Sequence, residues 1–272
     1  MERTAHDFDF RPVLVEKDYF CSLLLEAVLP PETSLIFKGG TCLSKIYADF
    51  YRLSEDLDFC IPLQGTVNRS ERRRLIDPSK KIVDSLPDKV AGVEIEEALG
   101  GRNESTQYVA VVRYRSVITG DWEKVKIEIA LREPLFLPAV IRNARTLVRN
   151  VFTGQDLVPP FPVRVIDLTE ALAEKTRAAL ARREAAIRDF FDLHYALENL
   201  KLRLDDPDFV KLLRQKLAVA GNERVQLTAE RRGALEKQYH TELPTVLRTK
   251  DIEKFNLNRV WTALTALAEK LK

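Results

Sequence analysis

Residues 37–59 read F-K-G-G-T-C-L-S-K-I-Y-A-D-F-Y-R-L-S-E-D-L-D-F. The stretch contains a Gly-Gly turn after an apolar run, a short helical segment, and a strand that carries Asp56 and Asp58. Alternate side chains of a strand share a face, so both carboxylates point the same way. Two like charges held this close need a cation between them, and Mg²⁺ is the usual one where carboxylates meet nucleotide phosphates. The stretch therefore predicts a magnesium and phosphate site.

The Gly-Gly turn lies between a short apolar strand and an expected helix at 41–51. At Gly39 and Gly40 the backbone can turn sharply, and its N–H groups can face a phosphate. Thr41 is the expected N-cap of the helix, whose first turn is a natural anion site. A Gly-Gly pair alone is equally typical of any tight turn. It gains meaning from the strand expected at 56–61, one helix length downstream.

Length and composition bound the remaining possibilities. The chain has 272 residues, of which 45% are hydrophobic and 31% charged, as in a soluble globular protein of one large or two ordinary domains. No apolar run is long enough to span a membrane, and the N-terminus lacks the layout of a signal peptide. The three cysteines lack metal-binding spacing, which favours reduced thiols in a cytoplasmic protein.

The net charge of +2 does not by itself indicate a nucleic-acid partner. Basic residues do gather in runs, at 72–74 and again at 182–188. Such runs are most often solvated helix faces, and the functional alternative is a patch that binds phosphates. Both interpretations remain open from the sequence.

A third carboxylate is expected on a neighbouring strand. Residues 123–130 alternate strictly between apolar and charged side chains, which predicts a strand with Lys126 and Glu128 on one face. Glu128 alone would be an ordinary solvent-facing residue. Beside Asp56 and Asp58, it is the expected third metal ligand.

The second half of the chain is helical in character. The pattern loosens at 133–162, where five prolines fall, so we expect a domain boundary near residue 150. Residues 1–150 would form one domain, and residues 151–272 a second, helical domain. No internal repeat is evident.

Lys175, Arg182 and Asp189 recur every seven residues, and Asp192 follows one turn later. On one continuous helix they would form a stripe, and on two antiparallel helices they could also meet. A ladder of solvent-exposed charges is the simpler interpretation. The functional one is that Lys175 binds nucleotide phosphates, Arg182 assists, and Asp189 orients the lysine or binds the nucleotide.

Several common enzyme classes are excluded. The sequence contains no G-x-S-x-G, H-E-x-x-H or G-x-x-x-x-G-K-[ST] motif, which argues against common serine hydrolases, zinc proteases and P-loop NTPases. The three histidines have no metal-like spacing.

Four motifs in order resemble the AbiEii/AbiGii toxin nucleotidyltransferases, the toxin half of type IV toxin–antitoxin pairs, to which the MenT toxins belong. They are F-K-G-G-T-x-L-S-K, then S-E-D-L-D-F, then K-x-x-A-x-x-x-R from Lys175 to Arg182, and R-D-x-x-D-L from Arg188. The resemblance covers residues 14 to 200. Thr41 stands where the family often has Ser, and the hydroxyl is retained.

The resemblance implies an α/β (α+β) fold, namely a polymerase-β-like nucleotidyltransferase domain with a mixed sheet, followed by a helical C-terminal domain. It implies catalytic roles for Asp56, Asp58, Lys175 and Asp189, with two Mg²⁺ ions held by Asp56, Asp58 and Glu128. The expected nucleotide contacts are Gly39, Gly40, Thr41, Lys45, Ser54, Arg182 and Asp192. The implied partners are an NTP, an RNA acceptor such as the tRNA 3′ end, and a cognate antitoxin. We expect a monomer without membrane association.

Two rival functions stay open. A related enzyme would modify a protein or a small molecule such as an antibiotic, and a nucleotide-binding partner protein would act without turnover. The intact Asp-x-Asp pair favours turnover, since carboxylates without a metal only repel a triphosphate. Ser54, two residues before Asp56, is a candidate site of inhibitory phosphorylation, with a turn-capping serine as the alternative.

Overall fold

The computed structural model describes residues 1–30, 33–63, 65 and 67–271. The chain divides into two compact units, Met1–Asp167 and Leu168–Lys272. The boundary therefore falls between residues 167 and 168, whereas the sequence had suggested a boundary near residue 150. The physical reason is that the proline-rich segment after residue 133 still contributes two strands, which belong to the sheet of the first unit.

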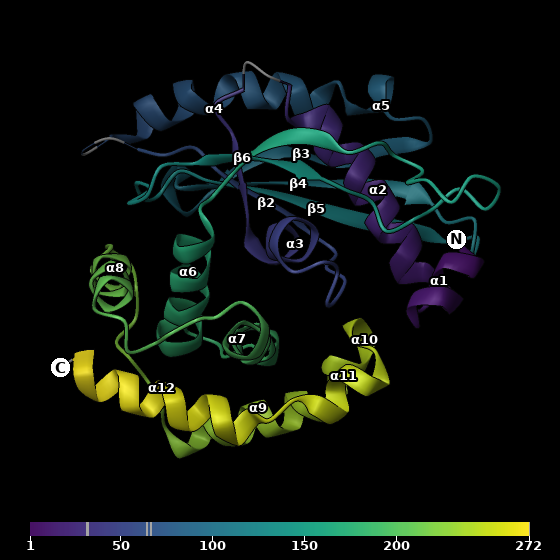
Figure 1. Cartoon of the computed structure of the whole chain (residues 1–272). Coiled ribbons are helices and arrows are strands. Elements are labelled where there is room, and N and C mark those ends of the chain that lie inside the picture. The colour runs from purple at the N-terminus through teal and green to yellow at the C-terminus, as the bar shows by residue number, and fades with distance from the viewer. Residues whose placement is uncertain (31–32, 64, 66, 272) are drawn as a thin grey trace. The chain divides into compact units, whose positions relative to one another are not determined.

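Within the described residues, seven strands of unit 1 form one mixed sheet in the order β3-β4-β5-β2-β1-β7-β6 (Figure 1). The strands are β1 Ile36–Lys38, β2 Leu57–Cys60, β3 Val93–Arg102, β4 Gln107–Arg115, β5 Trp122–Ala130, β6 Val140–Ala144 and β7 Phe161–Val165. β2 pairs with β5, and β1 with β7, in parallel, and the other pairs are antiparallel. The predicted α/β class with a mixed sheet is confirmed.

The two faces of the sheet differ in polarity at β2, β4 and β5. Val125, Ile127 and Ile129 of β5 are fully buried, and Lys126 and Glu128 between them are half-buried. The buried face is covered by helices, since α4 and α5 pack on β3 and the ring of Phe20 in α2 stacks on Tyr114 of β4. The helices of unit 1 are α1 Glu2–Phe8, α2 Pro12–Val28, α3 Gly39–Cys42, α4 Arg69–Asp84 and α5 Leu86–Lys89. The charged side chains consequently lie on the opposite face.

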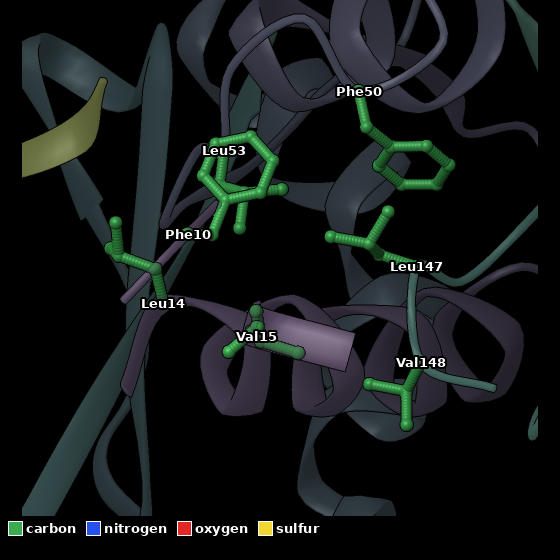
Figure 2. Close-up of a cluster of buried hydrophobic side chains, with 8 residues drawn as sticks. Phe10, Leu14, Val15, Phe50, Leu53, Leu147 and Val148 are labelled. Carbon is green, nitrogen blue, oxygen red and sulfur yellow. The ribbon is translucent and has the colours of Figure 1, made fainter. Parts of the chain in front are cut away.

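A satellite core anchors the loop that leads into β2. Figure 2 shows Phe50 and Leu53 of this loop beside Val15 of α2 and the pair Leu147 and Val148. All five side chains are at most 5% exposed. Burying side chains of this size contributes about 1.5–3 kcal/mol each, so the loop is held in place although Phe50 has a left-handed φ of 56°.

The helix after the Gly-Gly pair differs from the prediction in its start and its length. α3 begins at Gly39, with Lys38 as its N-cap, and it continues as a π-helix, η1, from Leu43 to Tyr47. Thr41 is therefore inside the helix and does not cap it. The two glycines form the first turn themselves because Gly39 supplies a φ of 78° that other residues rarely adopt.

Unit 2 consists of helices in the described part. They are α6 Leu168–Ala181, α7 Ile187–Asn199, α8 Pro207–Leu217, α9 Ala229–Thr241, α10 Leu243–Val246, α11 Thr249–Lys254 and α12 Leu257–Leu271. Its core contains a buried lysine, Lys216, whose ammonium lies 2.6 Å from Glu170 and 3.0 Å from Glu174. None of the helices that can be described in either unit is long and apolar enough to cross a membrane.

Candidate active site

Asp58 and Glu128 are neighbours on the charged face of the sheet. Parallel pairing of β2 with β5 places Asp58 directly opposite Glu128. One step before this pair, Leu57 lies opposite Ile127, and the same register brings Asp56 beside Lys126. Residues that differ by two along a strand share a face. The strand ladder thus gathers three carboxylates and one ammonium into a small array, which we call the carboxylate array (Asp56, Asp58, Lys126 and Glu128).

Lys126 is the cation of this array. Its Nζ lies 3.6 Å from Asp56 Oδ2 and 3.5 Å from Glu128 Oε2. Burial lowers the pKa of Lys126, but the charges of Asp56, Glu128 and Asp58 outweigh burial and raise it above its usual value. The lysine therefore stays protonated and partly neutralises the carboxylates.

Asp58 shows that this neutralisation is incomplete. Burial, together with the charges of Glu128 and Asp56, raises the pKa of Asp58 to about 6. Lys126 opposes this shift without cancelling it. A carboxylate in this state favours the arrival of further positive charge.

Gly39 leaves the room that Asp58 occupies. A Cβ at Gly39 would lie 2.1 Å from Asp58 Oδ2 and 2.7 Å from Asp58 Cβ. No real Cβ approaches another atom that closely, so the glycine is required by space as well as by its φ. The first turn of α3 is thus in direct contact with Asp58 of the carboxylate array.

Gly40 has a different neighbour. A Cβ at this position would lie 2.6 Å from a guanidinium nitrogen of Arg52 and 3.2 Å from Ser54 Oγ. Arg52 is only 2% exposed and also donates to the carbonyl of Leu53. Ser54 therefore lies over the Gly-Gly turn, and Arg52 is a buried cation at this turn that the sequence did not single out.

Two other predicted nucleotide contacts serve the scaffold in this structure. The hydroxyl of Thr41 donates to the carbonyl of Asp56, which ties α3 to the start of β2. The ammonium of Lys45 lies 2.6 Å from Asp18 Oδ1 and 2.8 Å from Ser22 Oγ, and its side chain is 1% exposed. The structure does not bring Lys45 to the carboxylate array, because the buried Asp18 holds it in the core.

In unit 2, the chain breaks between α6 and α7, and the predicted charges meet across the break. Lys175 Nζ lies 2.9 Å from Asp189 Oδ1 and 2.8 Å from Asp192 Oδ2. Arg182 Nη1 lies 3.4 Å from Asp189 Oδ2. Of the two arrangements open from the sequence, the one with two helices is confirmed. We call these four residues the lysine cluster.

The lysine cluster is buried at its acidic end. The side chains of Asp192 and Asp189 are 0% and 7% exposed, against 16% for Lys175 and 58% for Arg182. Arg231 of α9 holds the end of α6 next to the lysine cluster, because it donates hydrogen bonds to the carbonyls of Arg182 and Ala179 at 2.7 and 3.1 Å. The simpler interpretation from the sequence, in which all these charges are exposed to solvent, is therefore wrong for the two aspartates. Of the four residues, only Arg182 is largely exposed.

Comparison with known proteins identifies the family. The model of the family described as "Nucleotidyl transferase AbiEii toxin, Type IV TA system" matches residues 23–269, nearly the whole chain. The chain belongs to this AbiEii family. It is therefore a nucleotidyltransferase toxin of a type IV toxin–antitoxin system, and membership implies a cognate antitoxin and an NTP substrate.

Solved structures agree on the fold. The chain resembles JHP933 from Helicobacter pylori with a TM-score of 0.54 at 16% identity, over 96% of this chain and 92% of that one. It also resembles a candidate nucleotidyltransferase from H. pylori with a TM-score of 0.55 at 16% identity, over 96% of both chains. A comparison with curated proteins finds none that matches this AbiEii chain.

The donor set of this AbiEii toxin fits Mg²⁺ chemically, since carboxylate oxygens are the ligands that this ion prefers. The geometry is open, however. Among the side chains that the structure describes, no three His, Cys, Asp or Glu residues converge into a ready metal cage. Lys126 lies between two of the three carboxylates, so a shared ion requires this lysine to turn aside.

Lys126 was the main omission of the sequence analysis. Its face on the strand was predicted correctly, but alternation alone does not show which strand lies next to it. The parallel pairing of β2 with β5 supplies that information. Arg52 was missed because an arginine in a loop carries no signal of burial.

Proposed function

We propose that this AbiEii toxin transfers a nucleoside monophosphate from an NTP to an RNA acceptor, the 3′ end of tRNA, and thereby inhibits translation in the cytoplasm. The observation that carries the proposal is the carboxylate array on the charged face of the sheet, in contact with the glycine turn of α3. Carboxylates for a cation and backbone N–H groups for phosphates are then adjacent.

Asp56, Asp58 and Glu128 would hold Mg²⁺. When bound, the ion activates the attacking hydroxyl and neutralises the phosphates. In the reaction, the acceptor oxygen forms a bond to the α-phosphorus, the bond to the bridging oxygen breaks, and pyrophosphate leaves.

The chain's own residues orient the nucleotide. Gly39 and Gly40 open the first turn of α3 and would present N–H groups to the triphosphate. Lys175, fixed by Asp189 and Asp192, is the proposed phosphate ligand of unit 2, because the two aspartates hold its ammonium group in position.

The choice of an RNA acceptor is supported by the surroundings of the array. The charged face carries Lys124 and Arg113, which form salt bridges with Glu96 and Glu94 of β3, and the Arg113 guanidinium also lies 4.4 Å from the ring centre of Trp122. The aromatic ring suits the bases of a single-stranded RNA end, whose phosphates would have to replace the two glutamates as partners of the cations.

The test is a transfer assay with the full chain, Mg²⁺, each of the four α-labelled NTPs in turn, and total RNA. We expect label in RNA of tRNA size with at least one nucleotide, and none with the variant Asp56→Ala. Label in protein instead of RNA would support the rival enzyme class. Absence of label with every NTP would refute the proposal, and toxicity of a folded, inactive Asp56→Ala variant would refute the link between transfer and growth inhibition.

A further inference from the structure

A second charged feature of unit 1 lies away from the carboxylate array. A cavity of about 560 Å³ opens between α4 and the end of the β3–β4 hairpin. The four basic residues that line it are Arg69, Arg73, Lys80 and Arg102. Two acidic residues, Asp77 and Glu104, also line it, so positive charge is in excess.

The basic residues come from one stripe of α4 and from the opposing strand. Arg69, Arg73, Asp77 and Lys80 are spaced by four, four and three residues, which places them on one side of the helix. Lys80 is 3.1 Å from Asp77, whereas Arg69 and Arg73 are exposed. The two arginines are thus available to an anion in the cavity.

The hairpin end that closes the cavity is strained and braced. Asn103, Glu104 and Ser105 all have left-handed φ values, of 46°, 53° and 65°, which is unusual for three successive residues other than glycine. Arg72 holds this turn, since it donates to the carbonyls of Glu104 at 3.2 Å and of Val67. Strain of this kind gathers at functional sites.

A buried polar group points to a ligand independently. Tyr108 of β4 lines the cavity, is 2% exposed, and has a hydroxyl without a hydrogen-bond partner among the described residues. Its ring packs against Gly101, where a Cβ would lie 3.2 Å from Cε1. A buried phenol that makes no hydrogen bond is costly, and since its oxygen is closed to solvent, an anion in the cavity accepts from it only after the ring turns toward the cavity.

The cavity and the carboxylate array use neighbouring strands but lie on opposite faces of the sheet, since Tyr108 is on the face that α4 covers and Glu128 is on the charged face. Gly100 of β3 is paired with Val109 of β4, Val109 with Glu128 of β5, and Glu128 with Asp58. Gly100 therefore lies two strands from Glu128, a distance of about 10 Å at the usual spacing of strands. A polynucleotide that passes around the β3 edge can reach both places.

We infer that this cavity binds a phosphodiester group of the RNA acceptor, upstream of the end that is modified. The inference rests on the proposed function, because it specifies where the RNA acceptor is held. Arg69 and Arg73 contact the phosphate, Lys80 and Arg102 add positive potential, and the Tyr108 hydroxyl donates a hydrogen bond.

The experiment measures equilibrium binding of fluorescein-labelled bulk tRNA to the full chain between 50 and 200 mM salt, without NTP. The double variant Arg69→Ala/Arg73→Ala should bind roughly tenfold more weakly, and its plot of log affinity against log salt should be shallower by about 1.4–1.8, the slope of two phosphate contacts. The matched control is Arg74→Ala/Lys81→Ala, which removes two exposed charges of the same helix that do not line the cavity. The control should keep the wild-type slope.

An equal loss of slope in both double variants would show diffuse attraction and overturn the site. A Tyr108→Phe variant should bind tRNA several-fold more weakly, and unchanged affinity would overturn the role of the hydroxyl. Binding without transfer of label by the wild type would refute the proposed function and leave the site standing. Transfer by the wild type that the cavity variant retains in full would refute the site and leave the function standing.

Discussion

The carboxylate array and the lysine cluster contain similar residues in opposite electrostatic states. In the array, Lys126 is shared by three carboxylates, and the side chains of Asp56 and Lys126 are about 40% exposed. In the lysine cluster, Lys175 and Arg182 match Asp189 and Asp192, and the aspartates are buried. The described side chains therefore leave the array with excess negative charge and the cluster neutral. The array needs a ligand to become balanced, and the cluster does not.

The largest expected effect tests the unbalanced side of this comparison. Asp58→Asn should lower nucleotide transfer at least ~1000-fold, because the array loses a carboxylate that would hold Mg²⁺, and metal catalysis is worth several kcal/mol. The same variant should melt at a higher temperature than the wild type without Mg²⁺, since one of three mutually repelling charges is removed. Rates of label transfer and thermal melts measure the two effects. Retained activity would show that the array is not the metal site.

The second prediction tests the balanced side. Lys175→Met should lower the free energy of unfolding by about 3–5 kcal/mol, because the buried Asp189 and Asp192 lose the ammonium group that they share. Urea denaturation measures this loss. Lys216→Met is the matched control, since Lys216 is a buried lysine with two glutamate partners.

Both lysine variants should be destabilised, but only Lys175→Met should also lose NTP affinity in the folded protein. Equal NTP affinity in the two folded variants would show that Lys175 has a structural role alone.

A smaller effect is expected where charge is added next to the array. Ser54→Glu places a carboxylate over the Gly-Gly turn, close to Gly40, and should slow transfer roughly tenfold by repelling the triphosphate. Ser34→Glu, at an exposed position, serves as the control and should retain full activity. Full activity of Ser54→Glu would remove the case for phosphorylation as an off-switch.

The smallest effect concerns the cation of the array. Lys126→Met should cost at most about 1 kcal/mol of stability without Mg²⁺, because the lysine is substantially exposed. It should also tighten Mg²⁺ binding a few-fold, since a competing cation is removed. Lys124→Met, two residues away on the same strand, is the control for the loss of one positive charge. Calorimetric titration with Mg²⁺ measures the affinity of each variant. Weaker Mg²⁺ binding by Lys126→Met would mean that the lysine supports the ion and does not compete with it.

The sequence predicted the local features well and the tertiary ones in part. The shared face of Asp56 and Asp58 and the alternation around Glu128 follow from periodicity, which is a local property. The roles of Thr41 as a cap and of residue 150 as a boundary were wrong. Gly39 could start the helix itself, and β7 pairs with β1, a contact that no local pattern contains.

The predicted site likewise depends on contacts between distant parts of the chain, which no local pattern contains. Lys45 lies in a motif whose spacing suggests a nucleotide contact, but its direction depends on α2, which supplies Asp18 and Ser22. Lys126 belongs to the array because β5 pairs with β2, a strand from a distant part of the chain. Motif spacing thus identified which residue types matter, and packing decided which of them meet.

The pairing of β1 with β7 also has a consequence for biosynthesis. β1 lies in the middle of the sheet, between β2 and β7, yet β7 ends at Val165. Because domains fold as units and distant strands pair late, a growing chain cannot complete this sheet until well over half of it has left the ribosome. Glu128 likewise joins Asp58 only after a long interval of synthesis. The sheet that holds the carboxylate array is therefore complete only after all seven described strands of unit 1 have been synthesised.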